Sequence, residues 1–437
     1  MSELYVGKFG GSSLADSTQA RKVIDITRSD PRRRAIVVSA PGRRHASDEK
    51  VTDLLIAYRG FLDCGLPSYT GQIGKVVARF QEIAAGIGST FDEAMRLSLY
   101  RSTGDVLVSL GEQIMGRLMA EALGFAYLDA AAVIKLDTNG RLDMQASIAA
   151  SKPLIRAANT GVVVPGFYGS MPDGSIRTFS RGGSDISGAI VAAILGATVY
   201  ENWTDVDGIL MTDPAVVRNP EMIGWMSYQE MRELAYAGAR VLHDDAVFPA
   251  RNAGIPIHVR NTNVPERRGT YIDTREKLPP ARLGSITGIA ARKGFTVISL
   301  EKAGMNDEVG FAWKLLGILR DQEVRFDHMP GSIDGISLAI DDRELDGKLE
   351  SVLDGIRKVC EPDKLVVKRD VALICTVGRG MAQTPGVLAK LASAYAEADV
   401  NIVFIDQGAS EISIIIAVSN DDCEKAVQAI YAKFVQE

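Results

Sequence analysis

Three features of the sequence predict an α/β protein in which a mainly parallel sheet between helical layers precedes two small α+β units. Strand-like and helical patterns alternate from residue 1 to about residue 283 of the 437-residue chain. A glycine turn that carries Lys8 directly follows the first strand-like segment. Beyond residue 283, one sequence pattern occurs twice.

The alternating segments define the expected sheet. Continuous apolar strands separated by helices are typical of a parallel sheet covered on both faces, and ligands of such sheets bind at the carboxyl ends of the strands. The expected helices include residues 105–123 and 186–195, and the expected strands are residues 4–6, 35–38, 162–164, 198–203 and 255–259.

The repeat lies beyond a proline-containing linker at residues 278–283. Residues 310–340 and 386–416 align without a gap at an offset of 76 residues. Each copy carries a helical stripe, a strand, a turn and a second strand, which indicates one α+β unit used twice. We expect a regulatory or dimer-forming role, and a duplication that binds no ligand is the alternative.

Composition argues against several classes of function. The net charge of −6 disfavours nucleic-acid binding through basic patches, and the basic cluster at residues 32–34 is interpreted as a solvated face. No segment has the roughly 18 uncharged apolar residues of a membrane span, and we expect no secretory signal. The four cysteines and four histidines lack metal-ligand spacing, so we expect no metal site built from them and a cytoplasmic location.

Lys8 stands at the end of the first expected strand, in residues 8–13 (KFGGSS). Gly10 and Gly11 allow the backbone to turn tightly before the next helix. A lysine beside free backbone N–H groups at such a turn suits a phosphate. A glycine turn with a solvated lysine is the alternative.

A second motif, residues 180–185 (SRGGSD), opens the expected helix at 186–195. Ser184 or Asp185 can cap this helix, whose N-terminus favours an anion. Arg181 adds a planar donor fork that matches a carboxylate or a phosphate. A capped Gly-Gly helix start without a ligand is the alternative.

A third motif, residues 203–208 (WTDVDG), places acidic side chains at the end of a strand. Asp205, Asp207 and Asp213 do not form a calcium loop, because Gly208 directly follows the second acid and Val216 occupies the position of the glutamate. Such a turn suits ribose hydroxyls, or Mg²⁺ carried in by nucleotide phosphates.

Glu112 interrupts an apolar row formed by Val108, Met115 and Met119 at helical spacing. A buried acid is costly without a partner. A substrate ammonium group would supply one, and a structural salt bridge to an arginine is the alternative.

Four segments together resemble the aspartate kinases, whereas P-loop, dinucleotide-binding, hydrolase-elbow and protein-kinase motifs are missing. The likeness covers essentially the whole chain, and the two C-terminal copies resemble the ferredoxin-like tandem ACT domains of the same enzymes. The matching segments are residues 8–12 (KFGGS), 110–112 (LGE), 181–185 (RGGSD) and 203–209 (WTDVDGI).

This resemblance implies an amino-acid-kinase fold that transfers the γ-phosphoryl group of ATP, with Mg²⁺, to the β-carboxylate of L-aspartate. The product would be 4-phospho-L-aspartate, on the route to lysine, threonine and methionine. A carboxylate with a pKa near ~4 is ionised at neutral pH, so positioning and charge neutralisation should suffice for catalysis. The family also implies a homodimer or larger assembly formed through the ACT domains.

The resemblance also assigns roles to residues. Lys8 and Asp185 would be catalytic, and Gly10 and Gly11 would admit the phosphates. The substrate would contact Ser39, Thr52, Glu112, Arg181 and Ser184, and the nucleotide would contact Lys8, Thr204, Asp205, Asp213 and Arg240.

Four positions depart from the family pattern, and Asp244 and Asp245 are two of them, where the family frequently has proline after the histidine. Arg240 stands where the family frequently has a nucleotide-contacting lysine. The arginine keeps the positive charge but spreads it over a planar guanidinium in place of a compact ammonium group. Ala215 stands where many members carry an arginine. We therefore expect altered nucleotide affinity rather than an inactive protein.

The first copy is expected to hold an amino-acid effector, since ACT domains bind amino acids near the corresponding helix start. Asp327 aligns with Val403 in the second copy, so the polar pocket is confined to the first. The expected effector is lysine, with threonine as the alternative. The effector residues are Met305, Asn306, Asp327, Ser332 and Asp334.

We therefore predict a catalytic domain at residues 1–283 and a regulatory region at residues 284–437. The ACT units are expected at about residues 294–365 and at about residues 286–292 plus 370–437. The alternatives are another acyl-phosphate-forming kinase of the same fold, acting on glutamate or acetylglutamate, and a non-catalytic amino-acid sensor.

Overall fold

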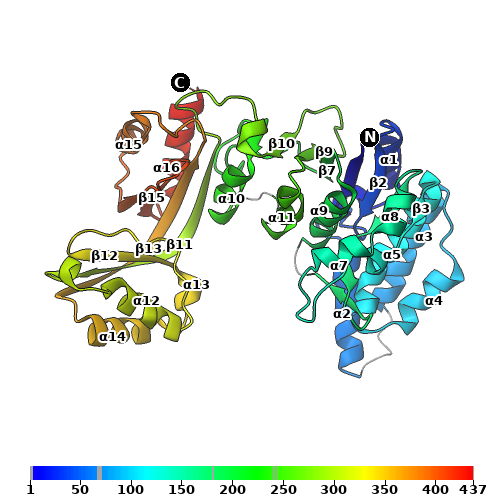
Figure 1. The fold of residues 1–437 in the computed structure, drawn as a ribbon, viewed down its shortest axis with the longest axis horizontal. Coiled ribbons are helices and arrows are strands. Elements are labelled where there is room, and N and C mark those ends of the chain that lie inside the picture. Colours follow the sequence, from blue (N-terminus) through cyan, green and yellow to red (C-terminus); the bar gives the residue numbers. More distant parts are fainter. Residues whose placement is uncertain (1–2, 66–70, 180–181, 240–241, 243, 437) are drawn as a thin grey trace. The chain divides into compact units, whose positions relative to one another are not determined.

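The computed structural model describes residues 3–65, 71–179, 182–239, 242 and 244–436. They form two compact units (Figure 1). The first comprises Met1–Ile209, Met222–Tyr228 and Leu242–Pro279, and the second comprises Leu210–Glu221, Gln229–Val241 and Pro280–Glu437. Two segments that precede residue 279 thus belong by their contacts to the C-terminal unit.

The first unit is built on an eight-stranded sheet, and this confirms the predicted α/β fold. Every neighbouring pair of strands is parallel except β9 and β10. In spatial order the strands are β3 (Ala126–Tyr127), β4 (Val162–Pro165), β2 (Arg33–Val38), β1 (Tyr5–Phe9), β7 (Val199–Thr204), β9 (Ile257–Asn261), β10 (Thr270–Asp273) and β8 (Trp225–Ser227).

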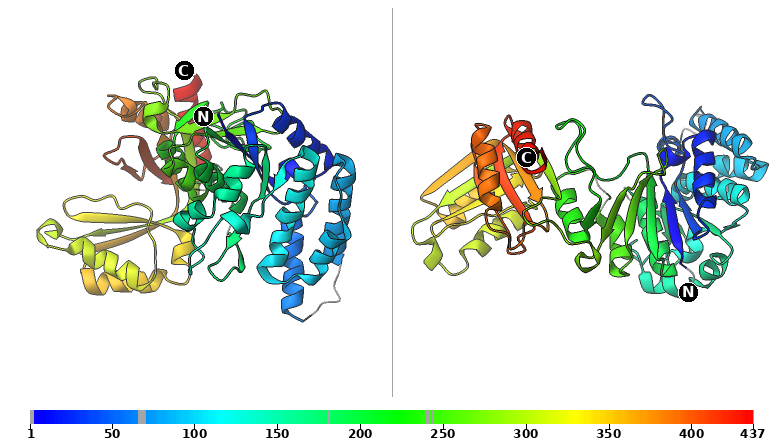
Figure 2. Two further views of the ribbon diagram at one scale, coloured as in Figure 1. Left: turned by 45° about the vertical axis from the view of Figure 1, so that its right-hand side comes forward. Right: turned by 90° about the horizontal axis from the view of Figure 1, so that it is seen from above.

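Helices cover the sheet on both faces (Figure 2). Phe9 and Trp203 point to one face, where they stack with ring centroids 5.8 Å apart within the large apolar core. Lys8 and Asn202 precede them and therefore point to the other face, where α9 packs. The helices of the first core are α1 (Ser17–Arg28), α2 (Val51–Asp63), α3 (Gly71–Ile87), α4 (Glu93–Arg101) and α5 (Gly104–Leu123).

The remaining short elements complete this unit. A hairpin of β5 and β6 lies outside the main sheet, and α11 packs on α9. The bounds are β5 (Tyr168–Ser170), β6 (Ile176–Thr178), α6 (Ala130–Val133), α7 (Met144–Ala149), α8 (Lys152–Ala157), α9 (Gly183–Leu195) and α11 (Asp244–Asn252).

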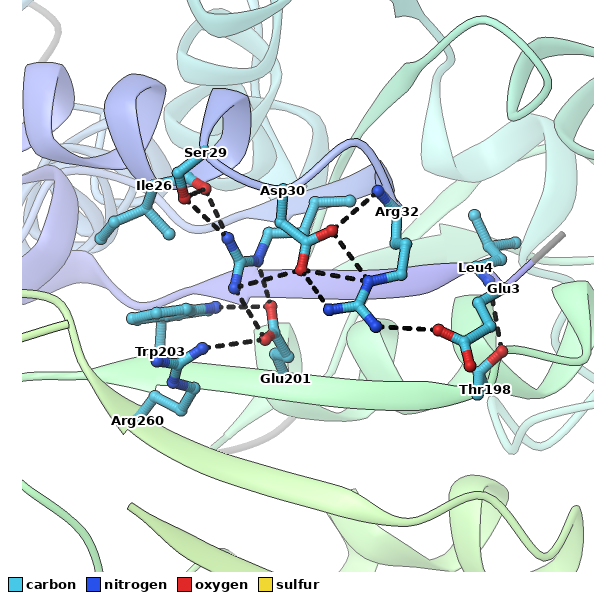
Figure 3. A network of polar contacts seen from close by, with 11 residues as sticks. Glu3, Leu4, Ile26, Ser29, Asp30, Arg32, Thr198, Glu201, Trp203 and Arg260 are labelled. Carbon is cyan, nitrogen blue, oxygen red and sulfur yellow. Dashed lines mark hydrogen bonds and ion pairs between the residues drawn. The ribbon is translucent and has the colours of Figure 1, made fainter. Parts of the chain in front are cut away.

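A buried ionic network joins β2, β7 and β9 (Figure 3). Glu201, only 1% exposed, accepts from Arg33 Nε at 2.6 Å, from Arg260 Nη1 at 3.3 Å and from Trp203 Nε1 at 3.1 Å. The Arg260 guanidinium also lies 4.4 Å from the Trp203 ring centroid. Full pairing is what makes such buried charges tolerable. The interpretation of residues 32–34 as a solvated face is therefore wrong for Arg33, because its partner comes from a distant strand.

The second unit contains a five-stranded antiparallel sheet in the order β12-β11-β13-β15-β14. β11 (Gly288–Glu301) and β13 (Lys364–Val377) stand 76 residues apart, as do α12 (Phe311–Asp321) and α15 (Val387–Glu397). Both helices follow a glycine with positive φ, 85° at Gly310 and 90° at Gly386, so the repeat predicted from sequence is present in the structure. The other elements are α10 (Tyr228–Tyr236), β12 (Gly335–Asp341), α13 (Asp342–Leu345), α14 (Leu349–Cys360), β14 (Phe404–Asp406), β15 (Ser413–Ser419) and α16 (Cys423–Tyr431).

The two copies are interlocked through their long central strands. Gly288 pairs with Val377 and Glu301 pairs with Lys364, so β11 and β13 run antiparallel along their whole lengths. Ile289 consequently packs in the core of the second copy, and Ile298 packs in the core of the first.

One element differs between the copies. The second copy has the expected strand β14, whereas the matching segment of the first forms only the isolated bridges His328–Ala339 and Gly331–Ile336. Pro330 lies between them and has no N–H to donate to a ladder. Among the helices of the described residues, none is both long and apolar enough to cross a bilayer.

Candidate active site

Lys8 lies at the carboxyl end of central strand β1 and pairs with an acid from α9. Its Nζ is 2.6 Å from Asp185 Oδ1, and its side chain is 8% exposed whereas that of Asp185 is 23% exposed. Gly182, with φ of 77°, turns the chain into α9 and so presents the first helical turn to the strand end. The two predicted catalytic residues therefore meet at the edge of the sheet where ligands of parallel sheets bind.

Asn202 joins this pair, although sequence reasoning did not select it. Its Nδ2 donates to the same Asp185 Oδ1 at 2.7 Å. Asn202 is the register partner of Lys8 in the β1–β7 pairing, and it is 2% exposed. The available signal was an amide beside Glu201 in a strand that is otherwise largely apolar and aromatic, but the partner of the amide depends on strand register and on the placement of α9.

The glycine turn after Lys8 is packed closely against a second turn. The Gly10 N–H donates to Trp203 O at 3.2 Å, and the Gly42 N–H donates to Gly11 O at 2.8 Å. A Cβ on Gly42 would lie 2.5 Å from the Gly11 carbonyl carbon, and one on Gly11 would lie 3.0 Å from Ala40 O. Glycine is therefore required at 42, and at 11 it avoids a tight contact with backbone atoms, which keeps the turn beside Lys8 compact.

Glu112 is buried at 2% exposure in the middle of α5. Its Oε1 accepts the Ala40 N–H at 3.1 Å, while its Oε2 has no hydrogen-bond partner in the described part of the chain. Burial raises the pKa of this carboxyl to about 8. The alternative of a structural arginine partner finds no support among the described residues, and the free oxygen is available to a ligand cation.

The remaining predicted substrate residues lie on neighbouring segments. Ser39 follows β2, and its hydroxyl is 3.1 Å from that of Ser184 in the first turn of α9. The next residue, Ala40, donates its N–H to Glu112. The adjacent residues Ser39 and Ala40 therefore connect α9 to Glu112. Thr52 is the second residue of α2 and is half-buried. Arg181 lies outside the described residues.

Of the other predicted nucleotide residues, two lie at the end of β7, one belongs to the second unit and one lies outside the described residues. Thr204 ends β7, and its hydroxyl is 3.1 Å from the carboxylate of exposed Asp205. Asp213 belongs to the second unit, where its Oδ1 accepts the Ala215 N–H at 2.8 Å. Arg240 lies outside the described residues, so its departure from the family pattern stays a prediction.

The predicted effector residues fall into two groups within the second unit. Met305 is buried in the core of the first copy, and Asp334 Oδ1 accepts the neighbouring Gly304 N–H at 3.0 Å, with Asn306 and Ser332 close by in sequence. Asp327 instead pairs with Arg292 Nη2 at 2.7 Å. Asp327 precedes His328, which forms an isolated bridge with Ala339 of β12. Ala339 is four residues along β12 from Gly335, where the turn that carries Asp334 ends, and four residues of extended chain span ~13 Å.

The described residues contain no group of three or more His, Cys, Asp or Glu side chains able to hold a metal ion. Mg²⁺ keeps several waters and commonly binds one or two carboxylates together with substrate phosphates. The exposed carboxylate of Asp205 fits that pattern, because it needs no dedicated cage of protein ligands.

Comparison with known proteins agrees with the geometry. Residues 3–261 match the model of the amino acid kinase family, and residues 374–434 match an ACT domain model. The chain is 38% identical over 452 residues to aspartokinase 3 of Bacillus subtilis (strain 168), covering 99% of this chain and 98% of that protein.

Solved structures give the same result. The crystal structure of Clostridium acetobutylicum aspartate kinase superposes with a TM-score of 0.92 at 43% identity, covering 99% of this chain and 100% of that one. E. coli aspartokinase III in complex with aspartate and ADP (R-state) superposes with a TM-score of 0.73 at 26% identity over 100% of both chains. These matches confirm the resemblance inferred from four short motifs. The chain therefore belongs to the amino acid kinase family and is a phosphotransferase of the aspartokinase group, with C-terminal ACT domains.

Proposed function

We propose that the chain transfers the γ-phosphoryl group of ATP to the β-carboxylate of L-aspartate and releases 4-phospho-L-aspartate and ADP. The observation that carries the proposal is the Lys8–Asp185 pair at the carboxyl end of β1, with the unpartnered oxygen of Glu112 held nearby through Ala40. The aspartate and ADP bound by the E. coli neighbour support the same pair of reactants.

The chemistry needs little from the protein beyond placement and positive charge. The β-carboxylate is already ionised at neutral pH, so its oxygen attacks the γ-phosphorus without a general base. The bond to the β,γ-bridging oxygen breaks, and its electron pair leaves with ADP. Lys8 would donate to the moving phosphoryl group and offset its charge.

The substrate's own charges would be matched by two residues. Arg181 would bind the α-carboxylate, and Glu112 would accept from the ammonium group through its free Oε2. Because burial raises the pKa of Glu112 to about 8, this carboxyl is largely protonated at neutral pH before aspartate binds. Aspartate binding would therefore release a proton as the ion pair forms.

Asp205 would help to hold a Mg²⁺ ion bound with the ATP phosphates, and the ion would supply charge neutralisation there. Asp205 and Thr204 would meet the nucleotide at the end of β7, since both lie at that edge of the sheet.

A hydroxamate assay with ATP, Mg²⁺ and a panel of carboxylic amino acids tests the reaction. We expect acyl phosphate from L-aspartate. Product from glutamate or acetylglutamate alone would instead support another acyl-phosphate-forming kinase of the same fold. No product from any acid would support a non-catalytic amino-acid sensor.

We further propose that the reaction is the feedback-controlled first step toward lysine, threonine and methionine, with lysine as the effector and threonine as the alternative. The lysine and aspartate bound by E. coli aspartokinase III in its T-state, a neighbour with a TM-score of 0.72 at 26% identity, support lysine. Three further expectations remain proposals of the same kind: the domain boundary between residues 283 and 284, a homodimer or larger assembly formed through the ACT domains, and a cytoplasmic location.

Replacing Asp327 with alanine is expected to relieve inhibition while the maximal rate is kept. Its carboxylate, 10% exposed, would pair with an effector ammonium in exchange for Arg292, which also lies 3.6 Å from a second acid, Asp341. We expect the half-inhibiting lysine concentration to rise at least tenfold, or about 1.4 kcal/mol, in steady-state assays.

Asp334→Ala is the comparison variant, because Asp334 belongs to the other group of predicted effector residues, is exposed and accepts the Gly304 N–H. An inhibition curve of Asp327→Ala that overlays the wild type would remove Asp327 from the effector site. A shift with Asp334→Ala alone would move the site to the turn at residues 304–334.

A further inference from the structure

Strand β7 holds the first turn of α9 through two buried side chains on one face. Asn202 donates to Asp185 Oδ1 at 2.7 Å, and the Tyr200 hydroxyl donates to the Asp185 backbone oxygen at 3.1 Å. Residues two apart in a strand share a face. Lys8 points to the same face, because it pairs in register with Asn202.

The fit between helix and strand is close at this point. Gly188 follows Asp185 by about one helical turn, and a Cβ there would lie 2.5 Å from the Tyr200 hydroxyl oxygen. Burial raises the pKa of Tyr200 well above its usual value, so the hydroxyl stays protonated and able to donate. α9 can therefore approach β7 only with glycine at 188, and its first turn is fixed in both position and rotation.

The carboxylate of Asp185 thus receives two donors on one oxygen, the ammonium of Lys8 at 2.6 Å and the amide of Asn202 at 2.7 Å. An ammonium group has three N–H donors and can turn. When Lys8 turns toward phosphates, the half-buried carboxylate of Asp185 would lose a partner, and a carboxylate with no other protein donor would be poorly satisfied there. The amide remains in place and supplies that other donor.

We propose that Asn202 is a positioning residue for phosphoryl transfer: it holds the Asp185 carboxylate in place while Lys8 exchanges that carboxylate for the phosphates of the nucleotide. The inference rests on the proposed function and adds to it a residue outside the recognised motifs. A purely structural role, in which Asn202 only fills space between β7 and α9, explains the residue less well. An apolar side chain of similar size would fill that space without burying a polar group.

Two substitutions of similar volume separate these accounts. Asn202→Leu removes the donor, and we expect kcat to fall 10- to 100-fold at every pH while the KM for aspartate stays within about twofold of the wild type. Glu112, which is proposed to bind the substrate ammonium group, lies on α5 and does not depend on Asn202, which is why the effect should fall mainly on kcat. The melting temperature of each variant is recorded alongside.

Asn202→Asp places a second carboxyl beside Asp185. In the described part of the chain, the titratable groups that contact Asp185 are Lys8 and Tyr200. Two adjacent carboxyl groups repel each other when both are ionised, so the pair retains one shared proton and the apparent pKa for its loss is raised. While that proton is held, the introduced carboxyl donates to Asp185 as the amide does, so kcat should approach the wild type at low pH. Once the proton is lost, two anions hold Lys8 and kcat should fall as pH rises.

Tyr200→Phe is the control, since it removes only the contact to the backbone oxygen and should keep the wild-type pH dependence. A kcat of Asn202→Leu within twofold of the wild type would overturn the proposal. So would a parallel, pH-independent loss in Asn202→Leu and Asn202→Asp that follows their melting temperatures.

A wild-type protein that forms no acyl phosphate would overturn the proposed reaction and leave the inference to a second measurement. Calorimetry with a non-hydrolysable ATP analogue then serves. Weaker binding by Asn202→Leu than by wild type would support the role of Asn202, and equal binding would contradict it.

Discussion

Replacement of Lys8 with methionine is expected to lower kcat by at least 10²- to 10³-fold, the range found when one preorganised donor to a transition-state charge is removed. Lys8 is 7% exposed at the carboxyl end of β1 and is the ammonium group paired with Asp185. The fold should tolerate the change, because Asp185 keeps its contacts to Asn202 and Tyr200. The rate of ADP release, measured by a coupled assay, checks the prediction.

Two further variants define what that loss means. Lys8→Arg keeps the charge but spreads it over a planar fork, so we expect a deficit nearly as large. Lys364→Met removes a solvent-exposed lysine that pairs with Glu301 in the second unit, and it should retain the full rate. A Lys8→Met enzyme with more than a tenth of the wild-type kcat would place the chemistry elsewhere.

Replacement of Glu112 with glutamine is expected to weaken aspartate binding and to stabilise the fold. Losing the charge opposite the substrate ammonium should raise the KM for aspartate at least 30-fold, since removing one partner of a buried charged pair costs about 2–5 kcal/mol. The pKa of Glu112 is about 8 in the folded chain, so it holds a proton there that the unfolded chain releases near pH 4.5. Stability therefore falls as pH rises across that window, by on the order of 3 kcal/mol at pH 7, and Glu112→Gln should not show this loss.

Urea unfolding and aspartate saturation curves between pH 5 and 9 would measure both effects. In the wild type the KM for aspartate should decrease with rising pH until about pH 8, because Glu112 must lose its proton to bind an ammonium group. Glu121→Gln is the control, since Glu121 lies on the same helix but is exposed and accepts from Thr90. A pH-independent KM in the wild type, or a less stable Glu112→Gln, would contradict the role given to this acid.

The features that sequence reasoning predicted best depend on local pattern. Alternating apolar runs and the 76-residue repeat predicted both sheets, because strand and helix periods are visible within a few residues. Lys8 could be selected from the sequence for the same reason, since it directly follows an apolar strand-like segment. Glu112 could be selected because a charged residue within an apolar row at helical spacing stands out in the sequence itself.

The features that were missed depend on the pairing of distant segments. Asn202 meets Asp185 only because β7 pairs with β1 in one register, which places Asn202 opposite Lys8. Arg33 is buried only because Glu201 and Trp203 arrive from another strand. Asp327 was grouped with Met305 because both were expected around one helix start and strand turn, whereas Asp327 pairs with Arg292 beside the bridge to Ala339. None of these contacts has a periodic signature.

The crossed pairing of β11 and β13 bears on how the regulatory region unfolds. Each strand gives one half to either core, so neither repeat retains a complete hydrophobic interior when the other is cut away. Heat should therefore melt both repeats in a single calorimetric endotherm. Gene fragments that encode one repeat alone should yield insoluble or molten polypeptides, so that gain or loss of this region during evolution would involve the two together.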